Sequence, residues 1–314
     1  MSTPNRELGA TRSAALDSPW RNRWRRFRTI AANAFDDLYR SKTAFAGAIM
    51  LLVLFTACAA APLLTKYDPI KTNYRVRLAP PSAEHIFGTD RYGRDVFSRI
   101  LWAGRRLLVI AICAVGFGLL LGIPLGVFSG HFGGWFDNAS MRLVDAMLAF
   151  PGILLFLLFV TLAHEYKLSG SGLDAVLVFA LGLAFMPETA RLTRGVAIAE
   201  SQKEYVEASA VLGNSGMYTA LREILPNCLS PLLVHATVLL GLVILIVAAL
   251  SYLGLGTAPP TPDWGADLRA AQDHMETRPL IAIFPGLAIF YTVLAFNLVG
   301  DGLRDVLDPR TADR

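Results

Sequence analysis

The chain has 314 residues, of which 54% are hydrophobic and only 17% are charged, and its formal net charge is +4. A typical soluble domain carries about a quarter charged residues. Here the apolar residues are gathered into long blocks, so the composition excludes an ordinary soluble domain and predicts a membrane protein.

Residues 1–43 precede the first apolar block. Within them, the run from Trp20 to Arg28 mixes arginine with aromatic side chains. A nucleic-acid patch is one interpretation, but a segment held at anionic lipids beside a membrane span explains the pattern better. The apolar block that follows comes too late for a secretory signal peptide. We expect a basic cytoplasmic tail that contacts membrane lipids and no nucleic acid.

Six apolar blocks approach or exceed the length that crosses a bilayer. Three contain no charged residue, namely 44–64, 107–128 and 280–300. Each of these exceeds the ~18 residues that mark a candidate span. The others are 146–163, directly after Asp145; 168–187, which contains Asp174; and 229–255, which contains His235. We therefore predict an all-α membrane protein with six transmembrane helices, whose even number places both termini on one side.

The segment 65–104 separates the first two predicted spans. Acidic and basic residues alternate between His85 and Arg99, which predicts a structured loop whose charges are paired locally. Gly88 and Gly93 lack the spacing of a phosphate-binding loop, and no Gly-Lys-Ser/Thr follows them. Since no such motif occurs anywhere in the chain, we expect it to bind no ATP.

Asp145 stands at the start of the third predicted span, where an unpaired carboxylate is costly. Arg142 lies three positions before it on the same helix face, so we predict a structural ion pair. The functional alternative is a proton relay or a contact with a transported molecule. Pro151 is expected to break the helix close by.

Other polar residues in the apolar blocks carry weaker signals. His235 has no carboxylate or cysteine at ligand spacing, so we predict no metal site there. Ser129 and His131 raise the alternative of an intramembrane hydrolase, but a glycine-rich turn at the membrane surface lacks a buried, oriented nucleophile. Pro124, flanked by two glycines, predicts a kink or a close helix contact. The cysteines show neither metal nor disulfide spacing and are expected to be packing residues: Cys58, Cys113 and Cys228.

The polar stretch 200–231 interrupts the apolar blocks and predicts two short helices. Ser201 and Glu204 have the spacing of a capping box, which predicts a helix start. Gly213 is placed to end that helix with a left-handed cap, and Pro226 to stop the second helix. One face of the first helix is acidic and carries Glu200, Glu204 and Glu207. The neighbouring face is apolar and carries Tyr205, Ala208 and Leu212.

This stretch resembles the "EAA" loop of ABC-importer permeases, through Glu207-Ala208-Ser209, Gly213 and Ile224-Leu225-Pro226. Ser209 departs from the usual alanine, and Ile224 directly precedes Leu225. In that family the helix before the glycine docks on a cytoplasmic ATPase and transmits its closure. The resemblance thus implies a coupling site made of Glu204, Tyr205, Glu207, Ala208, Ser209, Leu212 and Gly213.

Three further stretches resemble the C-type permeases of peptide and nickel importers. They are the GTD-x-x-GRDV-x-SR pattern at 88–99, the LG-x-G-x-x-PP-x-P-x-WG pattern at 253–265, and the final-span motifs at 284–286 and 297–305. Proline and glycine in the second pattern predict a rigid, non-helical connection. The resemblance implies external contacts with a solute-binding protein at Asp90, Gly93, Arg94, Asp95, Pro260, Trp264 and Gly265.

The implied architecture is a type I ABC importer permease fold with cytoplasmic coupling helices. An extra N-terminal span, 44–64, and the external segment 65–104 precede a five-helix core, 105–306, that contains the EAA loop at 200–231. A short cytoplasmic tail, 307–314, follows. The distribution of basic residues alone does not fix the orientation. The resemblance places both termini in the cytoplasm of a bacterium and the chain in its inner membrane.

The function implied is a non-catalytic permease subunit of an ATP-driven importer for dipeptides or short oligopeptides. Its implied partners are a homologous B-type permease, one or two cytoplasmic ATPase subunits that bind ATP and Mg²⁺, and an external solute-binding protein. The same machine could import nickel chelates, glutathione or antimicrobial peptides. An ion-driven secondary transporter is the alternative from another class. It requires paired charges in the membrane or inverted repeats, and neither is evident in the sequence.

Overall fold

The computed structural model describes residues 42–168 and 170–307. The basic N-terminal tail, apart from its last two residues, and the tail after residue 307 lie outside the described residues. The helices are α3 Lys42–Ala59, α4 Ala61–Leu64, α5 Val96–Phe132, α6 Gly134–Ala149, α7 Gly152–Glu165, α8 Ser171–Ser201, α9 Glu204–Val211, α10 Gly216–Thr219, α11 Leu225–Tyr252, α12 Trp264–Ala271 and α13 Leu280–Leu307. A π-helical turn, Ala220–Ile224, joins α10 to α11, and 3-10 turns lie at Tyr74–Val76 and Gln272–His274.

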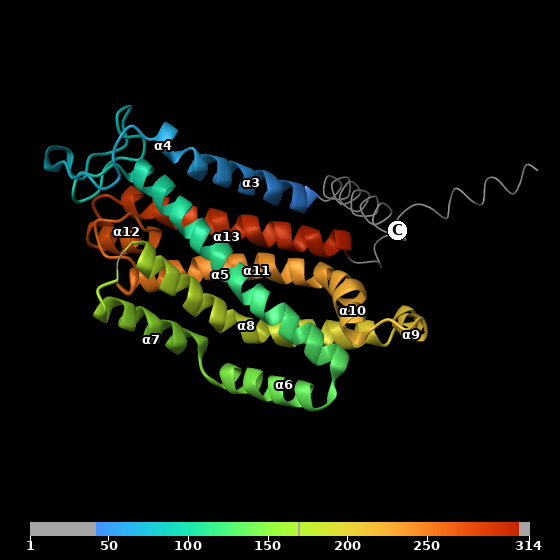
Figure 1. Cartoon of the computed structure of the whole chain (residues 1–314). Coiled ribbons are helices and arrows are strands. Elements are labelled where there is room, and N and C mark those ends of the chain that lie inside the picture. Colours follow the sequence, from blue (N-terminus) through green and yellow to red (C-terminus); the bar gives the residue numbers. More distant parts are fainter. Residues whose placement is uncertain (1–41, 169, 308–314) are drawn as a thin grey trace, which may run out of the picture.

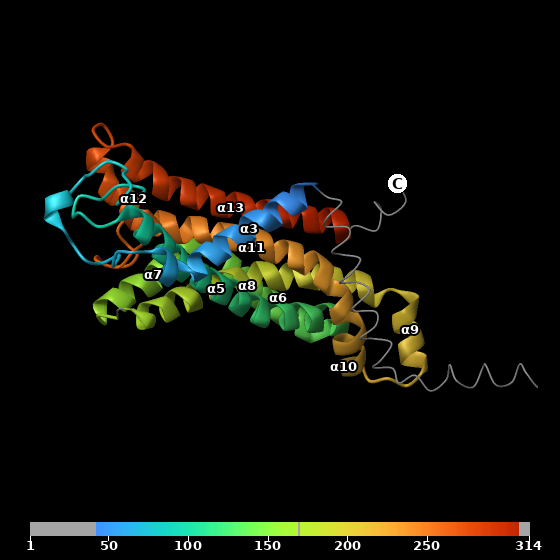
Figure 2. The ribbon, with the colours of Figure 1, turned by 90° about the horizontal axis from the view of Figure 1, so that it is seen from above.

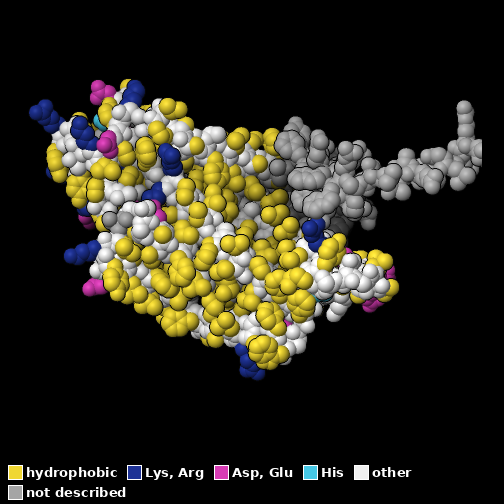
Figure 3. Space-filling model, viewed as in Figure 1, with side chains coloured by type: hydrophobic (Ala, Val, Ile, Leu, Met, Phe, Trp, Pro, Cys, Tyr) yellow, Lys and Arg dark blue, Asp and Glu magenta, His cyan; other side chains and the backbone are white. Residues whose placement is uncertain are grey.

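The long helices lie side by side and give the molecule two ends (Figure 1). Residues 65–95 and α12 occupy one end, and α9 and α10 occupy the other, an arrangement also visible from above (Figure 2). Hydrophobic side chains cover the middle of the surface, while charged side chains gather toward the ends (Figure 3). This distribution is expected where apolar tails surround the middle and water reaches both ends.

Within residues 42–168 and 170–307, five helical segments are long and apolar enough to cross a membrane, in agreement with five of the six predicted spans. The third predicted span, 146–163, is interrupted, as the helix break predicted at Pro151 implies. The chain breaks between α6 and α7, which meet at an angle of 75°. Pro151 has no backbone N–H and lies outside both helices, as its predicted helix-breaking role requires. The bent pair counts as a sixth span only if both helices are taken together.

Helices α5 and α8 form the centre of the bundle. Glycines on α5 face α8: a Cβ on Gly126 would lie 2.5 Å from the carbonyl oxygen of Ala190. Gly122 makes a similarly close approach to Thr189. The close helix contact predicted around Pro124 is therefore confirmed, and α5 continues through that proline. The N-terminal helix α3 packs mainly against α13, where the Phe55 and Phe296 rings meet edge to face.

Pro226 does not stop the second polar helix, contrary to the sequence prediction. It lies in the first turn of α11, and Gly216–Tyr252 is one continuous helical span. The π turn gives the reason: Leu225 N–H bonds to the carbonyl of Ala220, five residues back, so the hydrogen-bond pattern shifts just before the proline. The polar loop is thereby fused directly to a transmembrane helix.

Candidate functional site

The loop at one end of the bundle comprises residues 202–224 and is called here the α9 loop. Helix α8 ends at Ser201 and α9 starts at Glu204 with Lys203 as its N-cap. The predicted capping box is wrong, because Ser201 still belongs to α8 and no side chain caps α9. Lys203 instead binds the Glu200 carboxylate at 2.6 Å.

The C-terminal end of α9 agrees with the prediction. Gly213 has φ +80°, which a residue with a side chain adopts only with strain. Its N–H donates to the Ala210 carbonyl at 3.0 Å, and the Asn214 N–H donates to the Ser209 carbonyl at 3.2 Å. This pair of bonds is a Schellman motif, which satisfies carbonyls at the helix end. Gly213 therefore fixes the direction in which the chain leaves α9.

Ser209 is buried at the inner face of α9, and its hydroxyl meets three other polar side chains. Its hydroxyl donates to Glu223 Oε1 at 2.9 Å and accepts from Asn214 Nδ2 at 3.0 Å, with Thr219 Oγ1 3.2 Å away. Beside it, Val206 packs in an apolar cluster with residues of α5, α8 and α11. The serine that departs from the family pattern is thus a hydrogen-bonding centre that alanine would not replace.

Tyr205 provides a second anchor. Its hydroxyl donates to Glu200 Oε2 at 2.8 Å and accepts from Asn227 Nδ2 at 3.1 Å. Burial, together with the bond to the Glu200 carboxylate, raises the pKa of Tyr205 to about 12, so the phenol stays protonated and keeps donating at neutral pH. Tyr205 therefore ties α9 to the ends of both α8 and α11.

The opposite face of α9 is open to solvent. Glu204, Glu207 and Ala208 are exposed. Leu212 and its neighbour Val211 are 80% and 87% exposed and form an apolar tip. The predicted coupling residues therefore divide into an exposed set and an anchoring set, the latter being Tyr205 and Ser209. The predicted acidic face loses Glu200, which the two bonds above hold at the end of α8.

Sequence reasoning missed several residues of the α9 loop. Val206 and Glu223 anchor it, and Val211 extends the exposed apolar tip. The i, i+3 spacing of Val206 and Ser209 was the available signal for the buried stripe. The bond from Ser209 to Glu223 joins residues in different helices, so no spacing within one helix indicates it.

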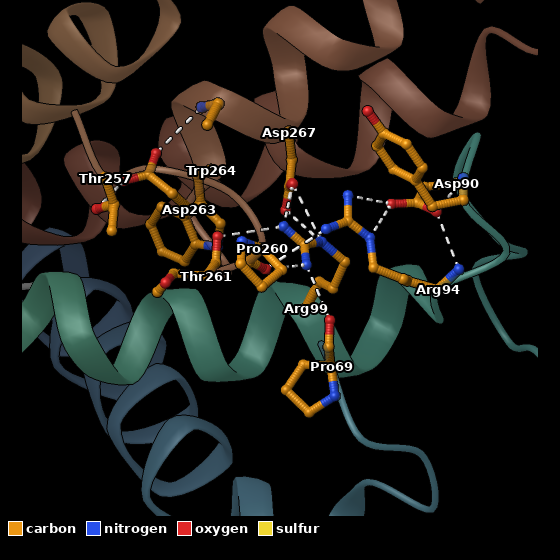
Figure 4. A network of polar contacts seen from close by, with 12 residues as sticks. Pro69, Asp90, Arg94, Arg99, Thr257, Pro260, Thr261, Asp263, Trp264 and Asp267 are labelled. Carbon is orange, nitrogen blue, oxygen red and sulfur yellow. Dashed lines mark hydrogen bonds and ion pairs between the residues drawn. The ribbon is translucent and has the colours of Figure 1, made fainter. Parts of the chain in front are cut away.

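The other end of the bundle is held by a set of residues called here the arginine network (Figure 4): Asp90, Arg94, Arg99, Asp267 and the carbonyl of Pro260. Asp90 accepts from the backbone N–H of Arg94 at 2.9 Å and from its Nε at 2.6 Å. Arg99 binds both carboxylate oxygens of Asp267 through Nε at 3.0 Å. Its Nη1 donates to the Pro260 carbonyl at 3.1 Å. The network joins residues 65–95, α5 and α12.

A helix cap and a tryptophan complete this end. Asp95 caps α5 by accepting from Ser98 N–H at 2.8 Å, and it also binds His85 Nδ1 at 2.9 Å. Trp264, which is 2% exposed, donates from its ring nitrogen to the Ile100 carbonyl at 2.9 Å. The local charge pairing predicted for segment 65–104 is confirmed for Arg94 with Asp90 and His85 with Asp95, whereas Arg91 and Arg99 pair with Asp273 and Asp267, far away in the chain. The predicted non-helical connection at 253–265 is wrong at its end, because Trp264 and Gly265 begin α12.

Two glycines allow close backbone approach here. A Cβ on Gly93, whose φ is +72°, would overlap the Asn73 carbonyl oxygen, and one on Gly265 would overlap that of Ala248.

Most side chains predicted to contact a binding protein are buried, with Asp90, Arg94, Asp95 and Trp264 each at most 8% exposed. The structure gives these four an internal supporting role. An open cavity of about 700 Å³ borders the network, lined by Arg91, Thr257, Arg269 and Gln272, among others.

The charges inside and next to the predicted spans have partners that the sequence did not indicate. Asp145 of α6 forms its ion pair with Arg191 of α8, and the predicted pairing with Arg142 is wrong. Asp174, in the first turn of α8, pairs with Arg106 of α5. Both pairs join different helices, so spacing within one helix could not show them. Each explains how a carboxylate is tolerated in an apolar block.

The hydrolase alternative finds no geometry to support it. The Ser129 hydroxyl donates to Asp137, while His131 Nδ1 lies 3.3 Å from Ser201 Oγ. Ser129 and His131 are thus directed to different partners. Within the described residues, no group of three or more potential metal-ligating side chains occurs. Cys58 and Cys228 are buried as expected for packing residues, but Cys113 is exposed.

Comparison with known proteins agrees with this architecture. The family model described as "Binding-protein-dependent transport system inner membrane component" matches residues 122–313. The model "N-terminal TM domain of oligopeptide transport permease C" matches residues 29–81.

Relatives match over nearly the full length. The chain is 40% identical over 307 residues to the glutathione transport system permease protein GsiD of Pectobacterium atrosepticum, covering 96% of this chain and 95% of that protein. It is 38% identical over 293 residues to the dipeptide transport system permease protein DppC of Alkalihalophilus pseudofirmus, covering 93% and 90%. Since family models and full-length relatives agree with an exposed loop on a transmembrane bundle, the chain belongs to the inner-membrane permease subunits of binding-protein-dependent ABC importers.

Proposed function

We propose that this chain forms half of the translocation path of an ATP-driven importer for dipeptides or short oligopeptides, and that α9 receives the force from a cytoplasmic ATPase. The observation that carries the proposal is the construction of the α9 loop. Its exposed face offers two carboxylates and an apolar tip, while its buried face is bonded to the ends of α8 and α11. A push on α9 is therefore delivered to two membrane helices.

The remaining parts of the machine follow from this role. A second, homologous permease of the B type completes the path, and one or two ATPase subunits hold ATP and Mg²⁺. A solute-binding protein docks at the opposite end, near the arginine network. The α9 loop, and with it both termini, faces the cytoplasm of the bacterium. The chain itself carries out no bond chemistry.

Charge reversal on the exposed face tests the docking assignment. In the complete transporter reconstituted with its binding protein, Glu207→Lys is expected to abolish peptide uptake. It should also abolish the stimulation of ATP hydrolysis that accompanies uptake. The matched control is Glu207→Asp, which keeps a carboxylate at this exposed position and should leave uptake and the ATPase response intact. Normal uptake by Glu207→Lys would refute docking through this face.

A second candidate substrate is glutathione, because the GsiD relatives are as similar to this chain as the DppC relative. Uptake of radiolabelled dipeptide and of glutathione by the same reconstituted complex separates the two. An ion-driven secondary transporter is the other class. Uptake by the purified chain alone, driven by an ion gradient without ATP, would establish that class and overturn the proposal.

A further inference from the structure

Glu188 is an ionisable residue at the middle of a membrane helix, and the function proposed above does not use it. It lies in α8 directly after Pro187, about 20 Å from the Ser201 end of the helix at 1.5 Å per residue. A hydrocarbon core is about 30 Å thick, so this carboxylate lies well inside the membrane. Its side chain is exposed, whereas those of Pro187 and Thr189 are buried. Within the described part of the chain it forms neither a hydrogen bond nor an ion pair.

A titratable group on a neighbouring helix, His235 of α11, lies close enough to interact electrostatically with Glu188. His235 Nε2 is buried, and no described residue bonds to it. Helices α8 and α11 contact each other, and the electrostatic interaction brings the two side chains into one polar region of their surface. Neither side chain has its hydrogen-bonding capacity filled by the chain itself.

The same surface continues one helical turn further along α8. Arg191 pairs there with Asp145 of α6, and their side chains are 56% and 61% exposed. With neutral histidine, the two carboxylates and one guanidinium leave this face net negative. A charge facing lipid at mid-membrane costs about 2.5–3.5 kcal/mol on insertion scales. A face that exposes three such groups is therefore better explained by contact with water.

The broken span lies against the same region. Gly152, at the start of α7, approaches Ala184 of α8, with 3.7 Å between the Ala184 Cβ and the position of a Cβ on Gly152. Ala184 is about one helical turn before Glu188. Non-helical backbone at membrane depth is tolerated where it is buried in protein or lines a water-filled cavity. Helix break, proline and unpaired carboxylate therefore coincide at one depth.

We propose that this face, formed by Glu188, His235 and the Asp145–Arg191 pair, lines the translocation path, and that the Glu188 carboxylate favours peptides with a cationic side chain over anionic ones. The inference rests on the proposed peptide import. The Arg191 charge is already compensated by Asp145, so Glu188 supplies the uncompensated charge. A passing ammonium or guanidinium group complements it, and a carboxylate is repelled.

Competing uptake of charged dipeptides tests this proposal. The complete reconstituted transporter is supplied with saturating binding protein loaded with Ala-Lys, Ala-Ala or Ala-Glu. For Glu188→Gln we expect the Ala-Lys to Ala-Ala uptake ratio to fall about fivefold, the effect of one charge at about 4 Å in water. The Ala-Lys to Ala-Glu ratio should fall about 30-fold, because the attraction of the cation and the repulsion of the anion are both lost. Glu188→Asp should keep both ratios. Glu84→Gln, an exposed glutamate in segment 65–95, is the matched control and should also keep them.

Equal loss of all three peptides in Glu188→Gln would overturn the proposal, since a pairing partner in the second permease would produce that result. If the unaltered transporter takes up no dipeptide, the proposed function fails instead. The accessibility of position 188 to a water-soluble reagent then still tests whether this face lines the path. In a Cys113→Ala background, a membrane-impermeant cationic thiol reagent should label Glu188→Cys but not Leu120→Cys, a depth-matched position on α5 that is 68% exposed. Failure to label Glu188→Cys with or without ATP would refute the exposed path.

Discussion

Ser209→Ala restores the residue that the family pattern prefers, yet we expect it to loosen the α9 loop. The substitution removes the donor to Glu223 Oε1, whose other oxygen is buried without a bonding partner in the described residues. It also removes the acceptor of Asn214 Nδ2. Leaving a buried polar group unsatisfied costs about 1–3 kcal/mol. This corresponds to a ~5- to 150-fold rise in the equilibrium for local opening of α9.

Hydrogen exchange followed by mass spectrometry measures this opening in the detergent-solubilised protein. Amides of α9 should exchange faster in Ser209→Ala, whereas amides in the middle of α5 should not change. Ala208→Ser, at an exposed position, is the control. Adding Glu223→Ala removes both partners of the bond. The loss of free energy that holds α9 closed should therefore be smaller in the double variant than the sum of the losses in the two single variants, by at least ~0.5 kcal/mol. Exchange within twofold of the original chain, or strict additivity, would refute the assigned role of Ser209.

Three further substitutions probe the packing of the bundle and its network. Asp267→Asn leaves the buried Arg99 charge without its carboxylate, so it should cost about 3–5 kcal/mol and lower the melting temperature in detergent; an unchanged melting temperature would contradict the buried pair. Gly93→Ala meets both a positive φ and the Asn73 carbonyl, and we expect faster proteolysis of segment 65–95. Gly126→Leu should separate α5 from α8 and reduce the yield of folded protein by size-exclusion chromatography, whereas a normal yield would show that the close contact is dispensable.

The sequence predicted the features that depend on a few neighbouring residues. Five spans followed from the length of apolar runs, because a segment without charge must reach across the hydrocarbon whatever it packs against. The cap at Gly213 followed from the same logic, since only glycine adopts φ +80° without strain. Pro151 marked the site of the helix break for the same kind of local reason.

Other predictions failed where the outcome depended on a neighbouring helix. Pro226 stays helical because a π turn shifts the hydrogen bonds before it. Asp145 pairs across to Arg191, because two helices bring these side chains together. Glu188 was overlooked because it lies one residue beyond an apolar block, and its exposure is known only once α8 is packed.

The sequence by itself thus determined the class of protein, its membrane helices and the loop that identifies the family, because hydrophobic length and backbone conformation are local properties. The tertiary structure decided which residues of the α9 loop face outward, why Ser209 stands where alanine is usual, and which charges of the membrane helices are paired. Those outcomes depend on distances between segments far apart in the chain, which no spacing along one helix contains.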